Sequence, residues 1–597
     1  MFLPDAVITK EEFIESKVLD EIAASKEKAC DEYHSLLSKK LIEEKDGDKA
    51  SESFALVRHT TSLMLNAGSS TEPFGPCFEM STHRAMIPSD LKENNLISLE
   101  NLVEVAEDPE ILSRALDILW ICKRGYKFGL RAVEEYIKAA DELEDPENWI
   151  NSAERLERAW RLARHLNNIQ LVARVRTIIE SKVEKYRSND SFYAANLIYQ
   201  LLEIGGDTSP LIPIAREHID RISLTKDSHK LREYLEIEYQ LKSKAGDQDA
   251  YDSKKEIAES YAKDAESSVA AGSYLGASQM LTKAIEAYRR IPGSTAKANE
   301  LHQLKISYQK NIDSELKTFT SDLVDISDTV KAAIGLVENK SFIDAIHSLS
   351  KQKSIVKSQL KTASEKIMQQ FIFRYIADGV TLNDEGKTVG VSPTIETADD
   401  QTNALQVTMY EQATSYYIPT LVTSVIEPAR RHMVSEGKAN LKDFIQLVTD
   451  NPFVPPGKEY IFALALYAGF KGDWLQFGSL ITSQLEASIR YILEQYGVVV
   501  TNIDDKGIQT EKDLNTLLYF PELEEILGED IVFSLRALLI VQAGPNLRNR
   551  FAHGLIDTYG FRSIHFVYLW WLVIKMIALW DMAIIAQAKI REENGST

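Results

Sequence analysis

Cysteine is scarce in this chain, and the few cysteines lie far apart. Only Cys30, Cys77 and Cys122 occur among 597 residues, an odd number without the close spacing of metal ligands. We therefore expect no disulfide framework, and a reducing cytoplasm suits the chain best. The first 17 residues, MFLPDAVITKEEFIESK, have no basic stretch followed by an apolar run, so no signal peptide is expected.

Several motifs of well-known enzyme classes are also missing. The 11 histidines are dispersed, with no H-E-x-x-H motif and no Cys/His cluster of zinc-binding spacing. The chain has neither the G-x-S-x-G motif of a nucleophilic serine nor the G-x-G-x-x-G motif of dinucleotide binding. We therefore expect no metal and no organic cofactor.

Positive charge is in short supply. Lys and Arg number 68 against 89 Asp and Glu, which gives a formal net charge of −21. Because phosphate binding depends on Lys and Arg, this balance argues against a protein that coats nucleic acids indiscriminately. A local basic pocket stays possible, since Arg548, Arg550 and Arg562 outnumber the single Asp557 within residues 546–566.

Long apolar runs are rare too, and the most membrane-like stretch is 566–586. Its uninterrupted apolar run ends at Lys575, and Asp581 follows. A helix that spans a membrane needs about 20 apolar residues. A buried helix of a helical domain is favoured over a transmembrane helix, and the aromatic run Tyr568–Trp571 is predicted to lie in the core rather than to form a stacking surface. A membrane-associated scaffold is the least favoured function.

What the chain does have is helix-forming sequence over most of its length. Strand-like alternation is scarce, so an all-α fold is predicted, with enough residues for roughly three or four domain-sized units. A small β-hairpin insertion is predicted near residues 378–392. The predicted parts are an N-terminal helical segment with a loop (1–90), a helical-repeat region (91–368), a connecting region with the hairpin (369–450) and a helical bundle (451–597).

The helical-repeat region contains a recurring pattern, Ser-aromatic-x-x-Ala, which begins at Ser191, Ser273 and Ser341. The second and third copies are 68 residues apart, close to twice the ~34-residue tetratricopeptide period, but the first and second are 82 apart. A tetratricopeptide-like solenoid with degenerate repeats and an irregular helical bundle therefore both remain open. A solenoid would offer a long surface to a protein partner.

A polar cluster near the end of the chain is flanked by apolar helical segments, 532–543 and 561–586. Gly544-Pro545 predicts the start of a helix between them. At helical spacing, this helix would have an apolar face formed by Leu547, Phe551 and Leu555. Its polar face would be formed by Asn549, His553 and Asp557, with Arg548 at the edge.

This cluster resembles a known family. Arg548-Asn549-x-x-x-His553-Gly554 is similar to the R-N-x-x-x-H-G signature of a domain family in the HEPN (higher eukaryote and prokaryote nucleotide-binding) superfamily. That superfamily is marked by Arg and His with four to six intervening residues, and four intervene here. Other segments between 450 and 590 resemble the same family in the same order, and 108–140 resembles the N-terminal part of such proteins.

The resemblance implies a metal-independent endoribonuclease with a toxin-like, antiviral or stress-response role. Such enzymes are usually homodimers with a composite active site, and they leave a 2′,3′-cyclic phosphate and a 5′-hydroxyl. We therefore expect an RNA substrate, dimerisation through the C-terminal domain and a possible protein partner on the helical-repeat region.

The residue types suit this chemistry. His553 could act as general base or acid, Arg548 could stabilise charge on the phosphate, and Asn549 could hold the imidazole or contact RNA. Five residues correspond to about 140° around a helix, so Arg548 and His553 would converge better in a cleft shared by two copies. Arg550 and Arg562 are further candidates for RNA contacts.

Within residues 477–495, a buried helical stripe is predicted, formed by Ile481, Leu485, Ser488, Ile489 and Ile492. Glu486 and Arg490 lie at i, i+4 on another face and are predicted to pair, either as supports of the site or as a surface pair. Asp557 is a third supporting candidate. The alternative function is a non-catalytic RNA-binding or dimerisation scaffold, in which Arg548 pairs with an acidic residue such as Glu486 and His553 is bonded within a core. A buried, paired His553 would favour this alternative, and an exposed cleft would favour the nuclease.

Overall fold

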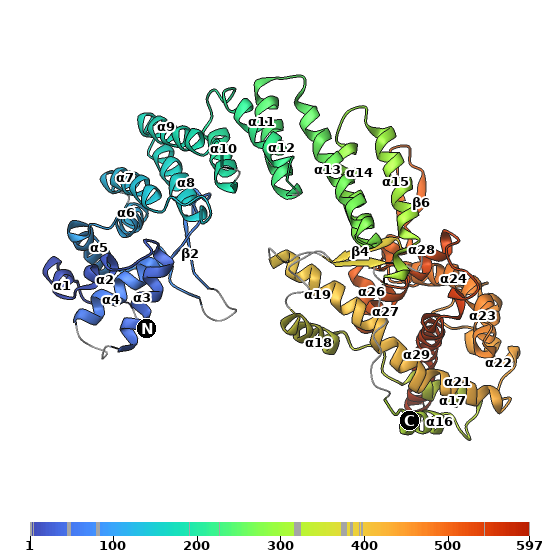
Figure 1. Cartoon of the computed structure of the whole chain (residues 1–597). Helices are drawn as coiled ribbons and strands as arrows, with labels where there is room; N and C mark the ends of the chain where they lie inside the picture. The colour runs from blue at the N-terminus through green and yellow to red at the C-terminus, as the bar shows by residue number, and fades with distance from the viewer. Residues whose placement is uncertain are drawn as a thin grey trace. The chain divides into compact units, whose positions relative to one another are not determined.

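The fold was derived from a computed structural model (Figure 1). The structure describes residues 3–595 except 4, 44–48, 79–83, 124, 190, 226, 316–323, 372–378, 383–385, 393, 394, 396, 397 and 543. Most of the described residues are helical, which confirms the predicted all-α class. The chain forms two compact units, Met1–Glu315 and Leu316–Thr597. The finer boundaries predicted after residues 90, 368 and 450 remain predictions.

Helices make up nearly all of the Met1–Glu315 unit. It begins with α1 (Lys10–Glu15), α2 (Val18–Ala23), α3 (Cys30–Glu43), α4 (Lys49–Thr61), the strands β1 (Met64–Leu65) and β2 (Phe74–Gly75) and the short helix η1 (Pro88–Asp90). It continues with α5 (Glu93–Val105), α6 (Pro109–Lys123), α7 (Tyr126–Glu142), α8 (Ile150–His165), α9 (Ile169–Lys185) and α10 (Phe192–Ile204). It ends with α11 (Leu211–Ile222), α12 (Ser228–Ala245), α13 (Ala250–Ala270), α14 (Tyr274–Arg289), α15 (Thr295–Gln309) and η2 (Ile312–Ser314).

From α5 onward the helices of this unit pack mainly against their neighbours in the sequence. Most consecutive helices contact each other, and α10 also contacts α8 and α12 (Figure 1). This is the packing expected of a helical-repeat array, in which each repeat buries its apolar face against the next. The tetratricopeptide period itself remains a prediction.

The recurring Ser-aromatic-x-x-Ala pattern marks the beginnings of helices. Its serines are the N-cap residues of α10, α14 and α17 (Phe342–Ser350). Its alanines, Ala195, Ala277 and Ala345, are all buried, which agrees with the close helix packing expected of a small residue. The side chains of Ser273 and Ser341 cap their helices, but Ser191 makes no such bond.

The Leu316–Thr597 unit is also helical. It begins with α16 (Ser327–Gly335), α17, α18 (Lys357–Gln370), β3 (Gly379–Leu382), β4 (Thr388–Ser392) and a helical run from α19 (Ala398–Gln412) through η4 (Ala413–Tyr417), α20 (Ile418–Leu421) and η5 (Val422–Ile426) to α21 (Glu427–Ser435). It continues with α22 (Leu441–Val448), α23 (Glu459–Lys471), α24 (Trp474–Gln495), β5 (Thr501–Ile503), β6 (Gln509–Glu511), α25 (Leu514–Leu517) and α26 (Pro521–Leu527). It ends with α27 (Glu529–Leu539), α28 (Leu547–Ala552), η6 (Gly560–Arg562) and α29 (Ile564–Gly595).

The described strands form three antiparallel pairs. β3 pairs with β4, which confirms the hairpin predicted near 378–392, although turn residues 383–385 lie outside the described part. β5 pairs with β6, and β1 with β2, and none of these strands was predicted from the sequence. These strands are two or three residues long, too short to show a period-two pattern.

Helix α29 lies at the centre of this unit's core. Tyr568, Trp570 and Trp571 are fully buried, so the interpretation of this aromatic run as core is confirmed. The Nε1–H groups of Trp570 and Trp571 donate to the carbonyls of Leu466 and Leu349, at 2.9 and 3.1 Å. Within the described part, Ile564–Ala583 is the one stretch long and apolar enough to cross a membrane, and 72% of its apolar window is buried inside the protein.

The close contact of α23 with α29 depends on Gly469. A Cβ atom at this position would lie 2.4 Å from Cδ1 of Trp570, which cannot move freely because its ring is buried and hydrogen-bonded. We expect Gly469→Ala to lower the free energy of unfolding by about 1–3 kcal/mol through overpacking. Gly335→Ala is the matched control, because a Cβ there meets nothing within 4 Å. Equal thermal unfolding midpoints of the two variants would contradict the prediction.

Candidate functional site

The motif that resembles the HEPN signature lies on a short helix. α28 spans only Leu547–Ala552 and begins two residues after Pro545, because Asn546 adopts a left-handed conformation with φ of 48°. The prediction that the helix starts at Gly544-Pro545 was therefore wrong. The helix ends before His553, and Gly554 (φ of 66°) turns the chain away.

Because α28 ends at Ala552, the apolar and polar faces predicted for a longer helix do not form. The N–H of Leu555 donates to the carbonyl of Arg550 at 2.8 Å, the bond that closes a helix C-terminus followed by a left-handed glycine. Leu555 is 58% exposed instead of buried beside Leu547. Asp557 no longer shares a helical face with His553, and its Oδ1 accepts from the N–H of Gly560 at 2.6 Å.

Arg548 is held by an acidic residue from another helix. Its Nη2 and Nε lie 3.1 and 3.3 Å from Oε2 of Glu486 on α24. The other carboxylate oxygen of Glu486 lies 3.1 Å from Nη2 of Arg490, so Glu486 bridges two arginines. The i, i+4 pair of Glu486 and Arg490 predicted from the sequence is thus confirmed, and the three side chains are each about one-fifth exposed.

Helix packing explains why Glu486 is placed there. The face of α24 formed by Ile481, Leu485, Ser488, Ile489 and Ile492 is buried, as predicted. Glu486 and Arg490 lie on the remaining face, and α24 contacts α28 directly. The burial of one helical face therefore turns the other toward Arg548.

Asn549 belongs to a network of amides. Its Nδ2 donates to Oδ1 of Asn546 at 2.8 Å and to Oδ1 of Asn515 on α25 at 3.2 Å. Its Oδ1 accepts from Nη1 of Arg548 at 3.0 Å. None of these hydrogen bonds involves the His553 imidazole, so the predicted role of Asn549 in holding that ring has no support in this conformation.

His553 is open to solvent. It is the C-cap of α28, its side chain is exposed, and its imidazole has no hydrogen-bond partner among the described residues. Arg562 is also exposed, and Arg550 is half-buried. The structure therefore shows one part of the non-catalytic alternative, the pairing of Arg548 with Glu486, but does not place His553 inside a paired core.

The charge around Arg548 is balanced rather than basic. Glu486 offsets Arg548, and Glu511 lies 3.0 Å from Nε of Arg490. The positive charge expected from the excess of arginine within residues 546–566 is thus partly offset by acidic side chains from other elements. Burial alone would raise the pKa of Asp513, but hydrogen bonds from Thr516 and Asn515 and the positive charge of Arg548 keep it below its ordinary value.

Sequence reasoning missed three members of this cluster, namely Glu511, Asp513 and Asn515. They come from β6, the connection after it and α25, which precede Arg548 by more than 30 residues. No spacing rule links them to the motif. The sequence indicates for Asp513 only the role of a helix N-cap. Asp513 does have this role, because its Oδ1 accepts a hydrogen bond from the N–H of Thr516 at 3.0 Å.

The cluster can bind an anion or transfer a proton through His553. It offers one exposed imidazole, two arginines that are already paired, and several amides. Across the described part of the chain, no group of three or more His, Cys, Asp or Glu residues is placed to hold a metal ion.

Comparisons with known proteins reach only part of the chain. No curated protein matches it. One similar solved structure is titled "Circular tandem repeat protein with novel repeat topology and enhanced subunit contact surfaces". It is 15% identical over 82% of this chain and 91% of that chain, and its TM-score of 0.15 is too low to support an argument. The family model of a domain of unknown function (DUF7380) matches residues 3–171, so this similarity lies within the Met1–Glu315 unit and does not include the candidate site.

Proposed function

We propose that the Leu316–Thr597 unit is a metal-independent endoribonuclease of the HEPN type. The observation that carries the proposal is the exposed His553 ring at the end of α28, five residues after Arg548, which Glu486 of a second helix holds in place. In the reaction, His553 would take the proton of a ribose 2′-hydroxyl while the 2′-oxygen attacks the phosphorus atom. The bond from phosphorus to the 5′-oxygen would break, and the 5′-oxygen would take up a proton from solvent, which gives a 2′,3′-cyclic phosphate and a 5′-hydroxyl.

Arg548 has a defined place in this proposal. Its contacts with Glu486 and Asn549 fix the plane of the guanidinium before RNA binds, and such preorganisation is what stabilises charge that develops on a phosphate. Arg550 and Arg562 would contact the flanking phosphates. A second copy of the chain, paired through this unit, would supply the other Arg548 and His553 of a composite cleft.

The test is cleavage of mixed cellular RNA by the full-length protein with EDTA present. We expect fragments whose 5′ ends accept phosphate directly from a kinase, because the mechanism leaves a 5′-hydroxyl. Addition of Mg²⁺ should not raise the rate. Cleavage that EDTA abolishes, or fragments that carry a 5′-phosphate, would contradict the proposed mechanism.

A second candidate function is an RNA-binding or dimerisation scaffold without catalysis. The observation that favours it is the pairing of Arg548, whose guanidinium nitrogens all have partners within the protein. Under this alternative, RNA would bind and the chain would dimerise, but no fragments would form under any ionic condition. Gel electrophoresis of labelled RNA after incubation with the protein distinguishes the two functions, because both include RNA binding and dimerisation but only the nuclease produces fragments.

A further inference from the structure

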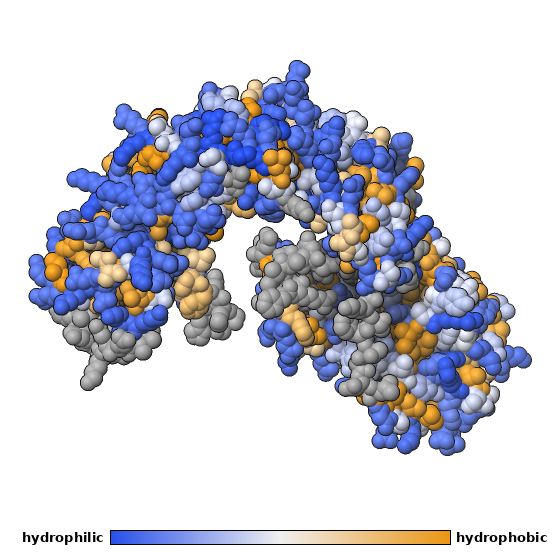
Figure 2. Space-filling model, in the orientation of Figure 1, coloured by the Kyte–Doolittle hydropathy of each residue, from blue (hydrophilic) through white to orange (hydrophobic). Residues whose placement is uncertain are grey.

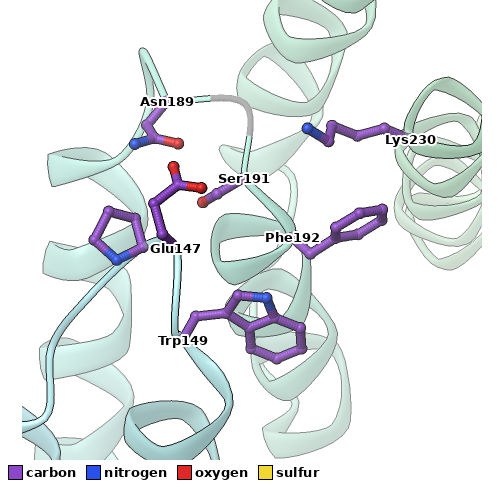
Figure 3. A pocket seen from close by; sticks show the side chains of 7 residues that line it. Glu147, Trp149, Asn189, Ser191, Phe192 and Lys230 are labelled. Carbon is purple, nitrogen blue, oxygen red and sulfur yellow. The ribbon is translucent and has the colours of Figure 1, made fainter. Parts of the chain in front are cut away.

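A cavity in the Met1–Glu315 unit suggests a separate binding site. Its volume is about 240 Å³, and it is lined by Pro146, Glu147, Trp149, Asn189, Ser191, Phe192 and Lys230 (Figure 3). These residues come from the α7–α8 connection, the α9–α10 connection, the beginning of α10 and the first turn of α12. The cavity and the proposed ribonuclease site belong to different units of the chain.

Two helices begin at this cavity without a side-chain cap. Trp149 is the N-cap of the 16-residue helix α8, and Ser191 is the N-cap of the 13-residue helix α10, and neither side chain bonds to the first turn. The N–H groups of a first helical turn have no partner within the helix and carry partial positive charge. The beginnings of α8 and α10 therefore favour a negatively charged group.

Ser191 gives independent evidence for a missing partner. It is 8% exposed, and its Oγ is buried without a hydrogen bond among the described residues, although it lines the cavity. A buried hydroxyl without a partner is costly, so such groups are rare in folded proteins. The serines at the same place in the pattern, Ser273 and Ser341, use their hydroxyls to cap their helices. The hydroxyl of Ser191 thus lacks the partner that the hydroxyls of Ser273 and Ser341 have.

The charged side chains stand on opposite sides of Ser191. Figure 3 shows Glu147 and Asn189 on one side and the ammonium of Lys230 on the other, with the rings of Trp149 and Phe192 below them. The Nζ of Lys230 lies 5.5 Å from the centre of the Phe192 ring and 3.6 Å from a carboxylate oxygen of Asp227. A carboxylate near Lys230 and Ser191 would be stabilised, and a doubly charged phosphate would be repelled by Glu147.

We propose that this cavity binds a small zwitterion with an aromatic group, such as a free aromatic amino acid. The ligand carboxylate lies toward Ser191, Lys230 and the first turn of α10. Its ammonium lies toward Glu147 and Asn189, and its ring packs against Trp149 and Phe192. The volume is below the ~300–1,000 Å³ of pockets for drug-sized ligands, which suits a molecule of this size.

The test is ligand-observed saturation-transfer NMR with the full-length protein and three probes at millimolar concentration. The probes are L-phenylalanine, 3-phenylpropionate, which lacks the ammonium, and 2-phenylethylamine, which lacks the carboxylate. We expect L-phenylalanine to bind and each analogue to bind about tenfold more weakly, since each loses a charge-assisted hydrogen bond. No transfer to L-phenylalanine, or equal binding of all three, would overturn the proposal.

Two variants test which residue contacts the carboxylate of the ligand and which contacts its ammonium. Lys230→Met should weaken L-phenylalanine about tenfold and leave 2-phenylethylamine unchanged, because only the first has a carboxylate. Glu147→Gln should weaken L-phenylalanine and leave 3-phenylpropionate unchanged. Lys297→Met on α15, which does not line the cavity, is the control. Glu147 and Lys230 are at least partly exposed, so their replacement should leave the fold intact. Unchanged binding of L-phenylalanine to the Lys230→Met variant would overturn the assignment.

Discussion

Replacing His553 with alanine is expected to lower the rate of RNA cleavage by about 10²–10⁴-fold, the usual contribution of a general acid or base. The reason is geometric as well as chemical. The His553 ring is the exposed proton acceptor of the cluster, whereas Arg548 and Asn549 are bonded within the protein. The measurement is the initial cleavage rate of a labelled RNA in EDTA, compared at equal protein concentration.

The control for this result is His302→Ala. His302 is an exposed histidine of α15 in the Met1–Glu315 unit, outside the candidate site, and its replacement should leave the rate unchanged. Unaltered cleavage by the His553 variant would show that the motif is structural and that the observed activity has another source. Lost cleavage with retained RNA binding would assign His553 to the chemical step.

Replacing Asp117 with alanine is expected to destabilise the Met1–Glu315 unit by about 3–5 kcal/mol. Asp117 on α6 is fully buried and accepts hydrogen bonds from Nε and Nη2 of Arg158 at 2.8 and 2.9 Å and from the Tyr136 hydroxyl at 2.9 Å. Its removal leaves the Arg158 guanidinium, 3% exposed, without a counterion. A buried charge that has lost its partner is among the most destabilising changes in a folded protein.

Hydrogen-exchange mass spectrometry of the full chain measures this effect locally. Amides of α6 and α8 should exchange roughly 10²–10⁴-fold faster in the Asp117 variant. This ratio of exchange rates corresponds to the expected loss of about 3–5 kcal/mol in the free energy of unfolding. Arg174→Ala is the control, because its pair with Glu134 is exposed at both ends and should contribute at most about 1 kcal/mol. Replacing Asp117 and Arg158 together with leucine should restore part of the protection, and equal exchange in wild type and the Asp117 variant would contradict the prediction.

Patterns that act over short distances were read correctly from the sequence. The buried stripe of α24, the aromatic core at Tyr568–Trp571 and the hairpin of β3 and β4 each follow from side chains a few residues apart on one helix or one pair of strands. A period of 3.6 or 2 residues is enough to decide which side chains face the core. The same reasoning failed at α28, where the left-handed conformations of Asn546 and Gly554 shorten the helix at both ends.

The sequence alone therefore determined the helical class, the identity of the core helices and the position of the motif. Only the tertiary structure decided that Glu486 and Asn515 surround Arg548 and Asn549, that His553 faces solvent, and that Glu147, Ser191 and Lys230 line one cavity. The physical reason is the separation along the chain of the residues that interact. Helix formation depends on neighbours within about one turn, whereas a site joins side chains whose separation in the chain carries no signal until the helices between them have packed.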